Sequence, residues 1–178
     1  MDECSAAQLL KHKKEIKKHL AKQYSFSHKQ PLLGIFLDNE LTENIEKNVQ
    51  SFLEAVSVLD VEVIVLADSN LNTLSLPNVI YLPYNRSSRK TLLEAVDMAL
   101  VFGFSDVEEM LLNGIIPISS ARDEISDYNP TRETGNSFVY NEENPWCIFE
   151  ALVRARETFK FPYDWKHIVR QGMKSVKG

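Results

Sequence analysis

Carboxylate side chains are the first candidates for chemistry in this sequence, as a general acid and a general base. The acids that invite this interpretation are Asp97, Asp123, Glu124, Asp127 and Glu133. Acid–base catalysis needs two such groups held on either side of one reacting bond. Nothing in the spacing of these acids places two of them opposite each other, so the pattern alone does not define a catalytic pair.

Histidines, cysteines and glycine motifs point to no metal or cofactor. His12 and His19 lie seven residues apart on one expected helix face, but further metal ligands are not evident. Cys4 and Cys147 have neither a disulfide framework nor a metal spacing. The glycine patterns of dinucleotide sites and phosphate loops, and the G-x-S-x-G of serine hydrolases, are absent from the sequence. We therefore expect no metal site and no cofactor.

Overall charge and hydropathy exclude several classes of partner. The 178 residues carry 25 acids and 20 bases, a formal net charge of -5. No global basic field is available to hold a nucleic acid or an anionic membrane. A lysine-rich stretch at 11–22 is the local exception, and we interpret it as the solvated face of a helix. Because no window approaches the ~18 apolar residues of a membrane span and no signal peptide is evident, we expect a cytoplasmic protein.

Short apolar runs alternate with helical patterns, which predicts a parallel sheet with helices on both faces. Such runs are typical of strands buried on both sides. They lie at residues 32–37, 61–66, 79–82, 98–102 and 115–118. The predicted fold class is α/β, Rossmann-like, with residues 1–178 forming one domain that has a leading helix at 1–24 and closing helices at 145–174. Three aromatic residues of the closing helices are predicted to be core: Trp146, Phe149 and Trp165.

Two local signals mark a short helix before the last predicted strand. Ser105 and Glu108 form an S-x-x-E capping box, and Gly114 can take the left-handed conformation that ends a helix. The polar segment 119–136 that follows the strand is predicted to be a long loop. Because it follows a parallel strand, we expect it at the carboxyl edge of the sheet, where open α/β sheets bind ligands.

Several segments, read in order, resemble the C-terminal half of bacterial glycogen synthase and plant starch synthase. These are retaining glycosyltransferases whose two Rossmann-like domains form the GT-B fold. The E-M-L-L-N-G-I-I-P-I of residues 109–118 is similar to the family's glutamate helix, glycine and I-P-I/V strand. The E-T-G-N-S-F-V-Y of 133–140 and the I-F-E-A-L-V-R-A of 148–155 resemble its T-G-F-x-F and A-L-x-R-A motifs. The resemblance covers about residues 13 to 174 and implies a nucleotide-sugar-binding domain.

The donor implied by this resemblance is ADP-glucose or UDP-glucose. Glu109 matches the glutamate that hydrogen-bonds the nucleotide ribose, and it is the one binding residue that we carry over. The family's arginine and lysine, which neutralise the donor diphosphate, fall on Asp38 and Glu43 here. These two acids have the wrong sign for that task.

Two further motifs of the family are lost or replaced. The F-E-P-C-G segment, which carries a glutamate at the reaction centre, is shortened between Val101 and Glu109. The Thr-Gly-Gly loop aligns with Arg122, Asp123 and Glu124, which leaves no glycine cradle for phosphate. The resemblance therefore predicts no catalytic residue in this chain.

Two functional hypotheses remain open, together with a third that shares the fold pattern. The acceptor half of a GT-B enzyme is not contained in these residues, so the first is a non-catalytic module that binds a nucleotide sugar, a glucan or a protein. The second is one half of a split glucosyltransferase, with the N-terminal domain supplied by a separate chain. The third is a receiver-type signalling domain, for which Asp38 or Asp68 is the phosphoacceptor candidate.

Overall fold

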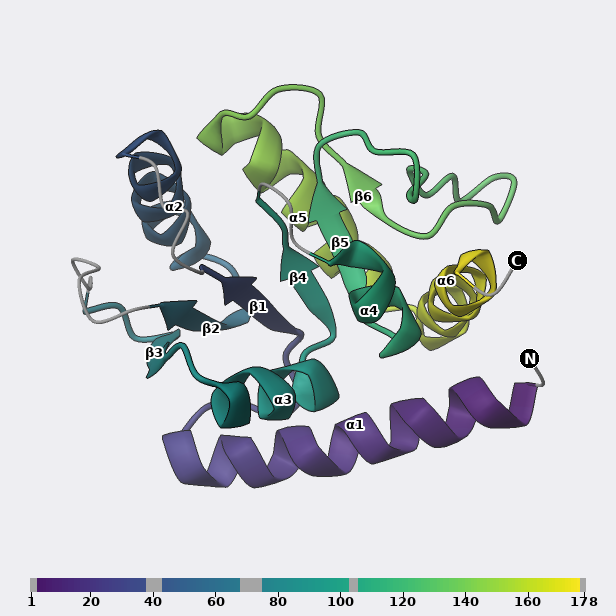
Figure 1. The fold of residues 1–178 in the computed structure, drawn as a ribbon, viewed down its shortest axis with the longest axis horizontal. Coiled ribbons are helices and arrows are strands. Elements are labelled where there is room, and N and C mark those ends of the chain that lie inside the picture. The colour runs from purple at the N-terminus through teal and green to yellow at the C-terminus, as the bar shows by residue number, and fades with distance from the viewer. Residues whose placement is uncertain (1–2, 38–42, 68–74, 103–105, 177–178) are drawn as a thin grey trace.

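The computed structural model describes residues 3–37, 43–67, 75–102 and 106–176. A parallel sheet runs through the centre of the molecule and helices pack around it (Figure 1). The strands are β1 (Leu32–Phe36), β2 (Glu62–Ala67), β3 (Val79–Pro83), β4 (Met98–Leu100), β5 (Ile116–Ser119) and β6 (Phe138–Val139). The helices are α1 (Glu3–Tyr24), α2 (Glu43–Val56), α3 (Arg86–Ala95), α4 (Val107–Leu112), α5 (Pro145–Phe159) and α6 (Pro162–Ser175).

The strand order is β3-β2-β1-β4-β5-β6, and every neighbouring pair is parallel. The chain builds outward from β1 in one direction, then returns past it to start β4 on the other side, where Leu33 pairs with Met98. This reversal between β1 and β4 is the switch point of a Rossmann-like fold, and ligands bind such sheets outside the carboxyl ends of the strands nearby. The predicted fold class is confirmed.

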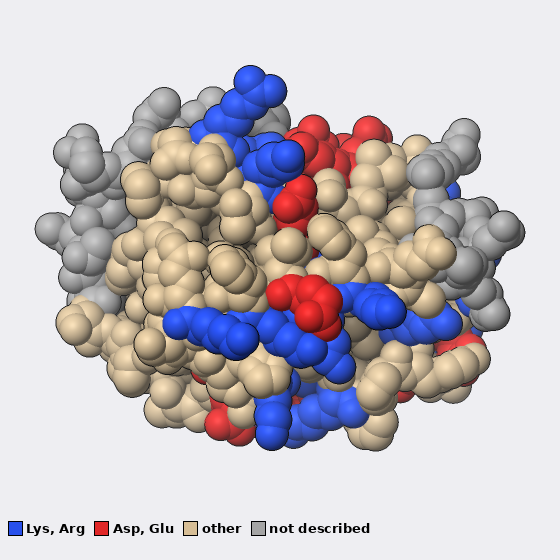
Figure 2. All heavy atoms as spheres, turned by 90° about the horizontal axis from the view of Figure 1, so that it is seen from below, with Lys and Arg blue, Asp and Glu red and all other residues tan. Residues whose placement is uncertain are grey.

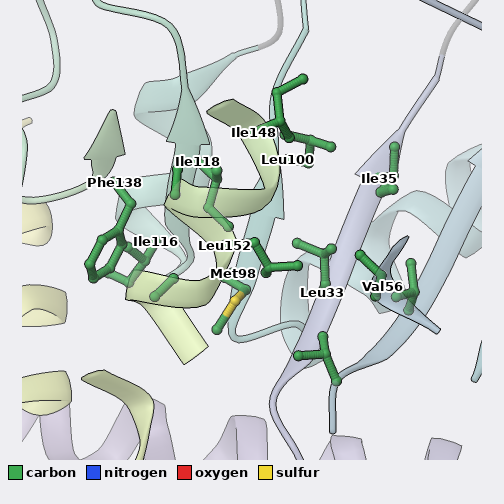
Figure 3. Packing of buried hydrophobic residues seen from close by; sticks show 14 of the residues in the cluster. Leu33, Ile35, Val56, Met98, Leu100, Ile116, Ile118, Phe138, Ile148 and Leu152 are labelled. Atoms are coloured by element: carbon green, nitrogen blue, oxygen red, sulfur yellow. The ribbon is translucent and has the colours of Figure 1, made fainter. Parts of the chain in front are cut away.

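Alternating side chains of each strand enter two separate cores, one on each face of the sheet. Leu33 and Ile35 pack in the cluster with α2, α5 and α6, whereas Leu32 and Phe36 pack in the cluster with α3 and α4. Figure 3 shows the first cluster, in which strand side chains meet Ile148 and Leu152 of α5. This period of two is what a strand covered on both faces requires.

Helix α1 lies along the amino edge of the sheet, beneath α3 and α6 (Figure 1). Its lysines are not all solvated, which corrects the prediction for residues 11–22. Lys13 and Lys17 are only 2% and 4% exposed, respectively. Lys17 Nζ donates to Asp97 Oδ2 at 2.6 Å, and Lys13 Nζ donates to the carbonyls of Leu93 and Asn113. These partners lie about eighty or more residues further along the chain, so the spacing of the lysines alone gave no sign of them.

Helix α4 begins one residue later than the capping box predicted. Asp106 is the N-cap residue, and its side chain accepts a hydrogen bond from Glu109 N at 2.9 Å. Ser105 lies outside the described residues. The end of the helix is as predicted, because Gly114 has φ +64, the left-handed conformation that glycine adopts without strain.

Trp146 is 79% exposed, which shows that the prediction of a core position was wrong. The buried residues of α5 include Ile148 and Leu152, and Trp146 precedes Ile148 by two positions. Two residues correspond to about 200° of rotation, so Trp146 lies on the opposite side of the helix. Trp165 is 5% exposed and belongs to the core as predicted. No helix in the described segments has the length and hydropathy of a membrane span.

Candidate functional site

A pocket of about 410 Å³ opens at the carboxyl edge of the sheet, and we call it the carboxyl-edge pocket. The residues that line it follow three neighbouring strands: Val101 and Phe102 follow β4, Ser120, Arg122 and Glu124 follow β5, and Tyr140 and Glu143 follow β6. Because parallel strands end at the same edge, residues far apart in the sequence converge here. The pocket therefore lies beside the switch point, at the place where this class of sheet binds ligands.

Backbone hydrogen bonds continue past the strand ends and fix the base of the pocket. Val101 N donates to Ile118 O at 3.0 Å, and Tyr140 N donates to Ser119 O at 3.0 Å. The pocket residues therefore begin directly where the ladder stops. Because these backbone hydrogen bonds fix the Cα positions of Val101 and Tyr140, the base of the pocket is preformed.

The predicted long loop between β5 and β6 is confirmed, and buried polar groups hold it in place. Asn136 is 4% exposed; its side chain accepts from Ser126 N at 2.8 Å and donates to Glu124 O at 3.2 Å. Gly135 has φ +105, and a Cβ at that position would lie 2.4 Å from Asp127 O. The segment that positions Glu124 is thus built around one obligatory glycine and one buried amide.

Tyr140 supplies a protonated hydroxyl group at the base of the pocket. Burial raises the pKa of Tyr140 to about 12, and the nearby Glu143 carboxylate acts in the same direction, while Arg122 opposes it. The hydroxyl is 3.4 Å from Val101 O, to which it donates. At neutral pH this group is a hydrogen-bond donor and carries no charge.

The charged groups of the carboxyl-edge pocket are mixed in sign. Arg122 is half-buried, and its Nε donates to Ser119 Oγ at 3.0 Å. Glu124 and Glu143 are exposed at the pocket, so the described part of its lining has one cation and two carboxylates. Such a set can accept hydrogen bonds from hydroxyl groups, but it does not form the positive field that a diphosphate needs.

Glu109, the predicted nucleotide-binding residue, lies in the first turn of α4 and forms an ion pair with Arg89 of α3. Arg89 reaches both carboxylate oxygens: Nη1 is 3.2 Å from Oε1, and Nη2 donates to Oε2. The hydrogen bond that Arg89 donates to Glu109 is the main cause that raises the pKa of Arg89, and burial acts against it. Glu109 does not line the carboxyl-edge pocket. A ribose would therefore have to compete with Arg89 for this carboxylate.

The structure separates most of the other residues that the sequence suggested. Arg122 and Glu124 share the pocket as the loop position predicted, whereas Asp123 is exposed and does not line it. Asp38 and Asp68 lie outside the described residues, and so does the side chain of Glu43. The three residues after Phe102 are also outside them.

Two of the candidate acids are engaged in ion pairs, and the two candidate histidines are exposed. Asp97 pairs with Lys17, and Asp127 pairs with Arg154 at 2.9 Å. His12 and His19 are exposed. No group of three or more potential metal ligands occurs among the described residues.

Sequence reasoning missed Tyr140 and Glu143 as residues of the pocket. The signal that finds them is the rule that ligand-binding residues follow the carboxyl ends of parallel strands. That rule needs β6, which is two residues long and leaves no apolar run of its own. Tyr140 was within reach as the last residue of the segment 133–140, which resembles a family motif.

Comparison with known proteins supports the resemblance over part of the chain. No family model matches the sequence. A segment of 66 residues is 33% identical to glycogen synthase 1 of Synechocystis sp., and the match corresponds to 35% of this chain and 14% of that protein. The chain thus spans a small part of the length of its curated relative.

Solved structures show the same fold at low sequence identity. The C-terminal domain of LpcC, a group 1 family glycosyl transferase from Francisella tularensis, matches with a TM-score of 0.57 and 16% identity, over 84% of this chain and 87% of that one. The calicheamicin glycosyltransferase CalG4 matches with a TM-score of 0.58 and 17% identity, over 84% of this chain and 40% of that one.

A UDP-GlcNAc 2-epimerase from Neisseria meningitidis, solved with UDP-GlcNAc bound, also shares this fold, with a TM-score of 0.58 and 14% identity. The match covers 92% of this chain and 47% of the epimerase chain. One fold therefore serves two kinds of reaction among these neighbours, and the fold does not specify the chemistry. The chain has the Rossmann-like fold of a GT-B glycosyltransferase C-terminal domain, and over a short segment it resembles a glycogen synthase.

Proposed function

We propose that this chain is a binding module of GT-B architecture that holds a hydroxyl-rich ligand, a nucleotide sugar in the first place, without transferring sugar by itself. The observation that carries the proposal is the carboxyl-edge pocket, which lies at the ligand-binding edge of the sheet and is lined by carboxylates, a protonated tyrosine and one arginine. A glucan and a protein are the other ligands that the sequence left open. One domain and a cytoplasmic location stay predictions.

The chemistry of the pocket favours hydroxyl groups as the binding determinants. Glu124 and Glu143 accept hydrogen bonds from sugar or ribose hydroxyls, and charge-assisted hydrogen bonds of this kind are the strong ones. Arg122 carries the opposite charge and donates hydrogen bonds to oxygen atoms of the ligand. All three contacts suit the hydroxyl groups of a sugar or a ribose. The two carboxylates repel a phosphate, so the affinity expected for a nucleotide sugar is weak.

The same lining argues against transfer of glucose by this chain. Departure of a nucleoside diphosphate requires positive charge at the developing anion, and loss of one such contact costs roughly 100 to 1,000-fold in rate. The family's two cationic positions fall on acids, Asp38 and Glu43. In the alternative of a split glucosyltransferase, a separate chain would have to supply these charges.

Calorimetric titration tests the proposal with UDP-glucose, ADP-glucose, UDP, ADP and a linear maltooligosaccharide. We expect saturable, weak binding of the sugar nucleotides, which Glu143→Gln weakens several-fold by removing a charged acceptor. Lys90→Gln changes an exposed cation on α3 and serves as the control. Titrations without heat for all five compounds, or equal affinity in the Glu143→Gln variant, would overturn the proposal.

We also propose that Glu109 contacts ribose once Arg89 releases it. The Arg89→Ala variant then binds sugar nucleotides more tightly than the unmodified chain, since the carboxylate no longer has a competing partner. The Glu109→Ala variant binds them more weakly. If Glu109→Ala instead tightens binding, the freed Arg89 is the group that meets the ligand, through its phosphates, and the assignment to Glu109 is wrong.

A further inference from the structure

A second and larger concavity lies at the opposite edge of the sheet, and we call it the amino-edge groove. Its volume is about 570 Å³, within the range of roughly 300 to 1,000 Å³ that is typical of small-ligand sites. Lysines of α1 and of the loop after it form the rim, and apolar residues at the α5–α6 junction form a wall. The residues that matter are Lys14, Lys18, Lys29, Leu10, Phe159 and Pro162.

The floor of the groove is electrically balanced. Lys17 Nζ is 2.6 Å from Asp97 Oδ2, and the same carboxylate oxygen accepts from Leu32 N at 2.8 Å. Lys17 also lies over the ring of Phe159, with its ammonium 5.2 Å from the ring centroid. Asp97, the one carboxylate in the described lining, is therefore already compensated and does not offset the cations of the rim.

The rim concentrates positive charge that this structure does not neutralise. Lys14 and Lys18 are four residues apart on α1, so their ammonium groups lie on one face and repel each other. Neither Lys14 nor Lys29 makes an ion pair in the part of the chain that the structure describes. Among the described residues, Lys18 pairs only with exposed Glu15, at 2.9 Å. Seen from the side of α1, lysine and arginine side chains form a band across this face (Figure 2).

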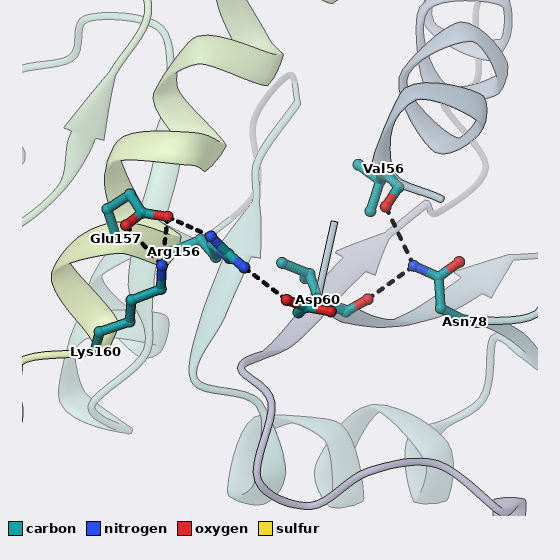
Figure 4. A network of polar contacts seen from close by, with 7 residues as sticks. Val56, Asp60, Asn78, Arg156, Glu157 and Lys160 are labelled. Carbon is teal, nitrogen blue, oxygen red and sulfur yellow. Dashed lines mark hydrogen bonds and ion pairs between the residues drawn. The ribbon is translucent and has the colours of Figure 1, made fainter. Parts of the chain in front are cut away.

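Further cations lie at one end of the groove, where a smaller pocket of about 250 Å³ shares Lys29 and Phe159 with it. Arg156 and Lys160 of this pocket are held by acids: Arg156 donates to Asp60 at 2.8 Å, and Lys160 donates to Glu157 at 2.8 Å (Figure 4). These pairs fix the end of the wall. The unpaired charge therefore stays with Lys14 and Lys29.

We propose that the amino-edge groove binds a small organic phosphate whose apolar body packs on Leu10, Phe159 and Pro162. Its phosphate is held by the ammonium groups of Lys14, Lys18 and Lys29. A phosphate offers several acceptor oxygens to lysine point charges, and its charge removes the repulsion between neighbouring lysines. This site is separate from the carboxyl-edge pocket and does not depend on the function proposed for that pocket.

Phenyl phosphate is the probe, because it combines a phosphate with one apolar ring. Titration calorimetry at low salt compares it with inorganic phosphate, which lacks the ring, and with phenol, which lacks the phosphate. We expect phenyl phosphate to bind more tightly than either. Equal affinity for phenyl phosphate and inorganic phosphate, or for phenyl phosphate and phenol, would overturn the proposal, because the groove would then not bind both the phosphate and the apolar ring.

Two double variants with the same change in net charge locate the site. Lys14→Glu with Lys29→Glu reverses two rim charges, and we expect a loss of affinity for phenyl phosphate of at least roughly tenfold. Lys22→Glu with Lys90→Glu reverses two exposed lysines that do not line the groove, and we expect a change of less than about twofold.

Equal losses in both double variants would show unspecific charge attraction and would sink the proposal. Far-UV circular dichroism checks that each variant is folded. Arg122→Ala separates the two sites, because it alters the carboxyl-edge pocket and leaves phenyl phosphate binding unchanged. A loss of phenyl phosphate affinity in Arg122→Ala would place the phosphate at the other edge and contradict the assignment.

Discussion

The amino and carboxyl edges of the sheet use their charged residues differently. At the amino edge Lys13, Lys17 and Asp97 are buried and fully engaged with partners on other elements. At the carboxyl edge the acids of the pocket are exposed, and the signs are mixed. Buried charges with several partners lock a scaffold, whereas exposed charges at strand ends remain available to a ligand. In this chain, the buried charges of the amino edge secure the architecture, whereas the exposed charges of both edges remain available to ligands.

Lys13 shows how closely the amino edge is tied together. Its ammonium donates to Leu93 O at 3.2 Å and to Asn113 O at 3.0 Å, in the last turn of α3 and at the C-cap of α4. Carbonyls at helix C-termini lack partners within the helix and carry partial negative charge. One lysine of α1 therefore caps two helices that cover the same face of the sheet.

The largest expected effect is the loss of the buried acid at the amino edge. Asp97→Ala leaves the ammonium of Lys17 buried without its counter-ion and removes the acceptor of Leu32 N. Breaking a buried pair in this way costs about 3–5 kcal/mol of unfolding free energy. Urea denaturation measures it. The control is Glu157→Ala, which removes an exposed acid and costs less than about 1 kcal/mol of unfolding free energy. Similar losses in both variants would contradict the contrast between buried and exposed ion pairs.

The next effect concerns the loop that shapes the carboxyl-edge pocket. Gly135→Ala forces a side chain into φ +105, with its Cβ against Asp127 O. We expect a loss of about 2–3 kcal/mol in the same urea experiment. Gly172→Ala is the comparison, because its Cβ would lie 2.7 Å from the end of the Leu111 side chain, which can shift, and 3.7 Å from Asn136 Cβ, while α6 gains helix propensity. Unchanged stability of Gly135→Ala would show that the loop is not fixed as described.

Burial of Lys13 gives a pH dependence of stability with a definite sign. Burial lowers the pKa of Lys13 to about 8, from 10.5. Between these values the unfolded chain binds the proton and the folded chain does not, so raising the pH favours folding. Relative to Lys13→Met, the unmodified chain gains about 2 kcal/mol between pH 8 and 9.5. A difference that stays flat over this range would mean that Lys13 is solvated.

The smallest expected effect is that of Tyr140→Phe at the carboxyl edge. The hydroxyl makes a long hydrogen bond to Val101 O, and its removal costs about 0.5–1 kcal/mol. Binding of UDP-glucose should fall in the same variant, because the pocket loses the hydroxyl oxygen as an acceptor for hydroxyl groups of the ligand. Thermal unfolding and calorimetry separate the two results. A stability loss above about 2 kcal/mol would assign Tyr140 to the scaffold and not to the ligand.

Five strands of the sheet could be predicted from the sequence because each of them is a local apolar run. Each run of the five longer strands is continuous, as strands covered on both faces require. β6 escaped prediction because two residues, Phe138 and Val139, leave no periodic signal. The burial of Lys13 and Lys17 could not be predicted, because a lysine is buried only where hydrogen-bond acceptors surround its ammonium group. The acceptors of these two lysines lie eighty or more residues further along the chain.

The location of the candidate site at the carboxyl edge of the sheet could be predicted, but only part of the residues that line it could be. The loop expected after β5 lies at the carboxyl edge of the sheet, where its Arg122 and Glu124 line the pocket. The ion pair of Glu109 with Arg89 was not predictable, because α3 and α4 are brought together by packing on the same core and not by any spacing in the sequence.

Amide chemical-shift mapping tests the contrast between the two edges most directly. A titration of the isotopically labelled chain with UDP-glucose should shift the amides of Ser120, Arg122 and Glu143, whether or not its diphosphate also shifts those of Lys14 and Lys29. That result is predicted if the carboxyl-edge pocket is the place where a hydroxyl-rich ligand binds. Shifts confined to Lys14, Lys29 and their neighbours, or no shifts at saturating ligand, would contradict the account.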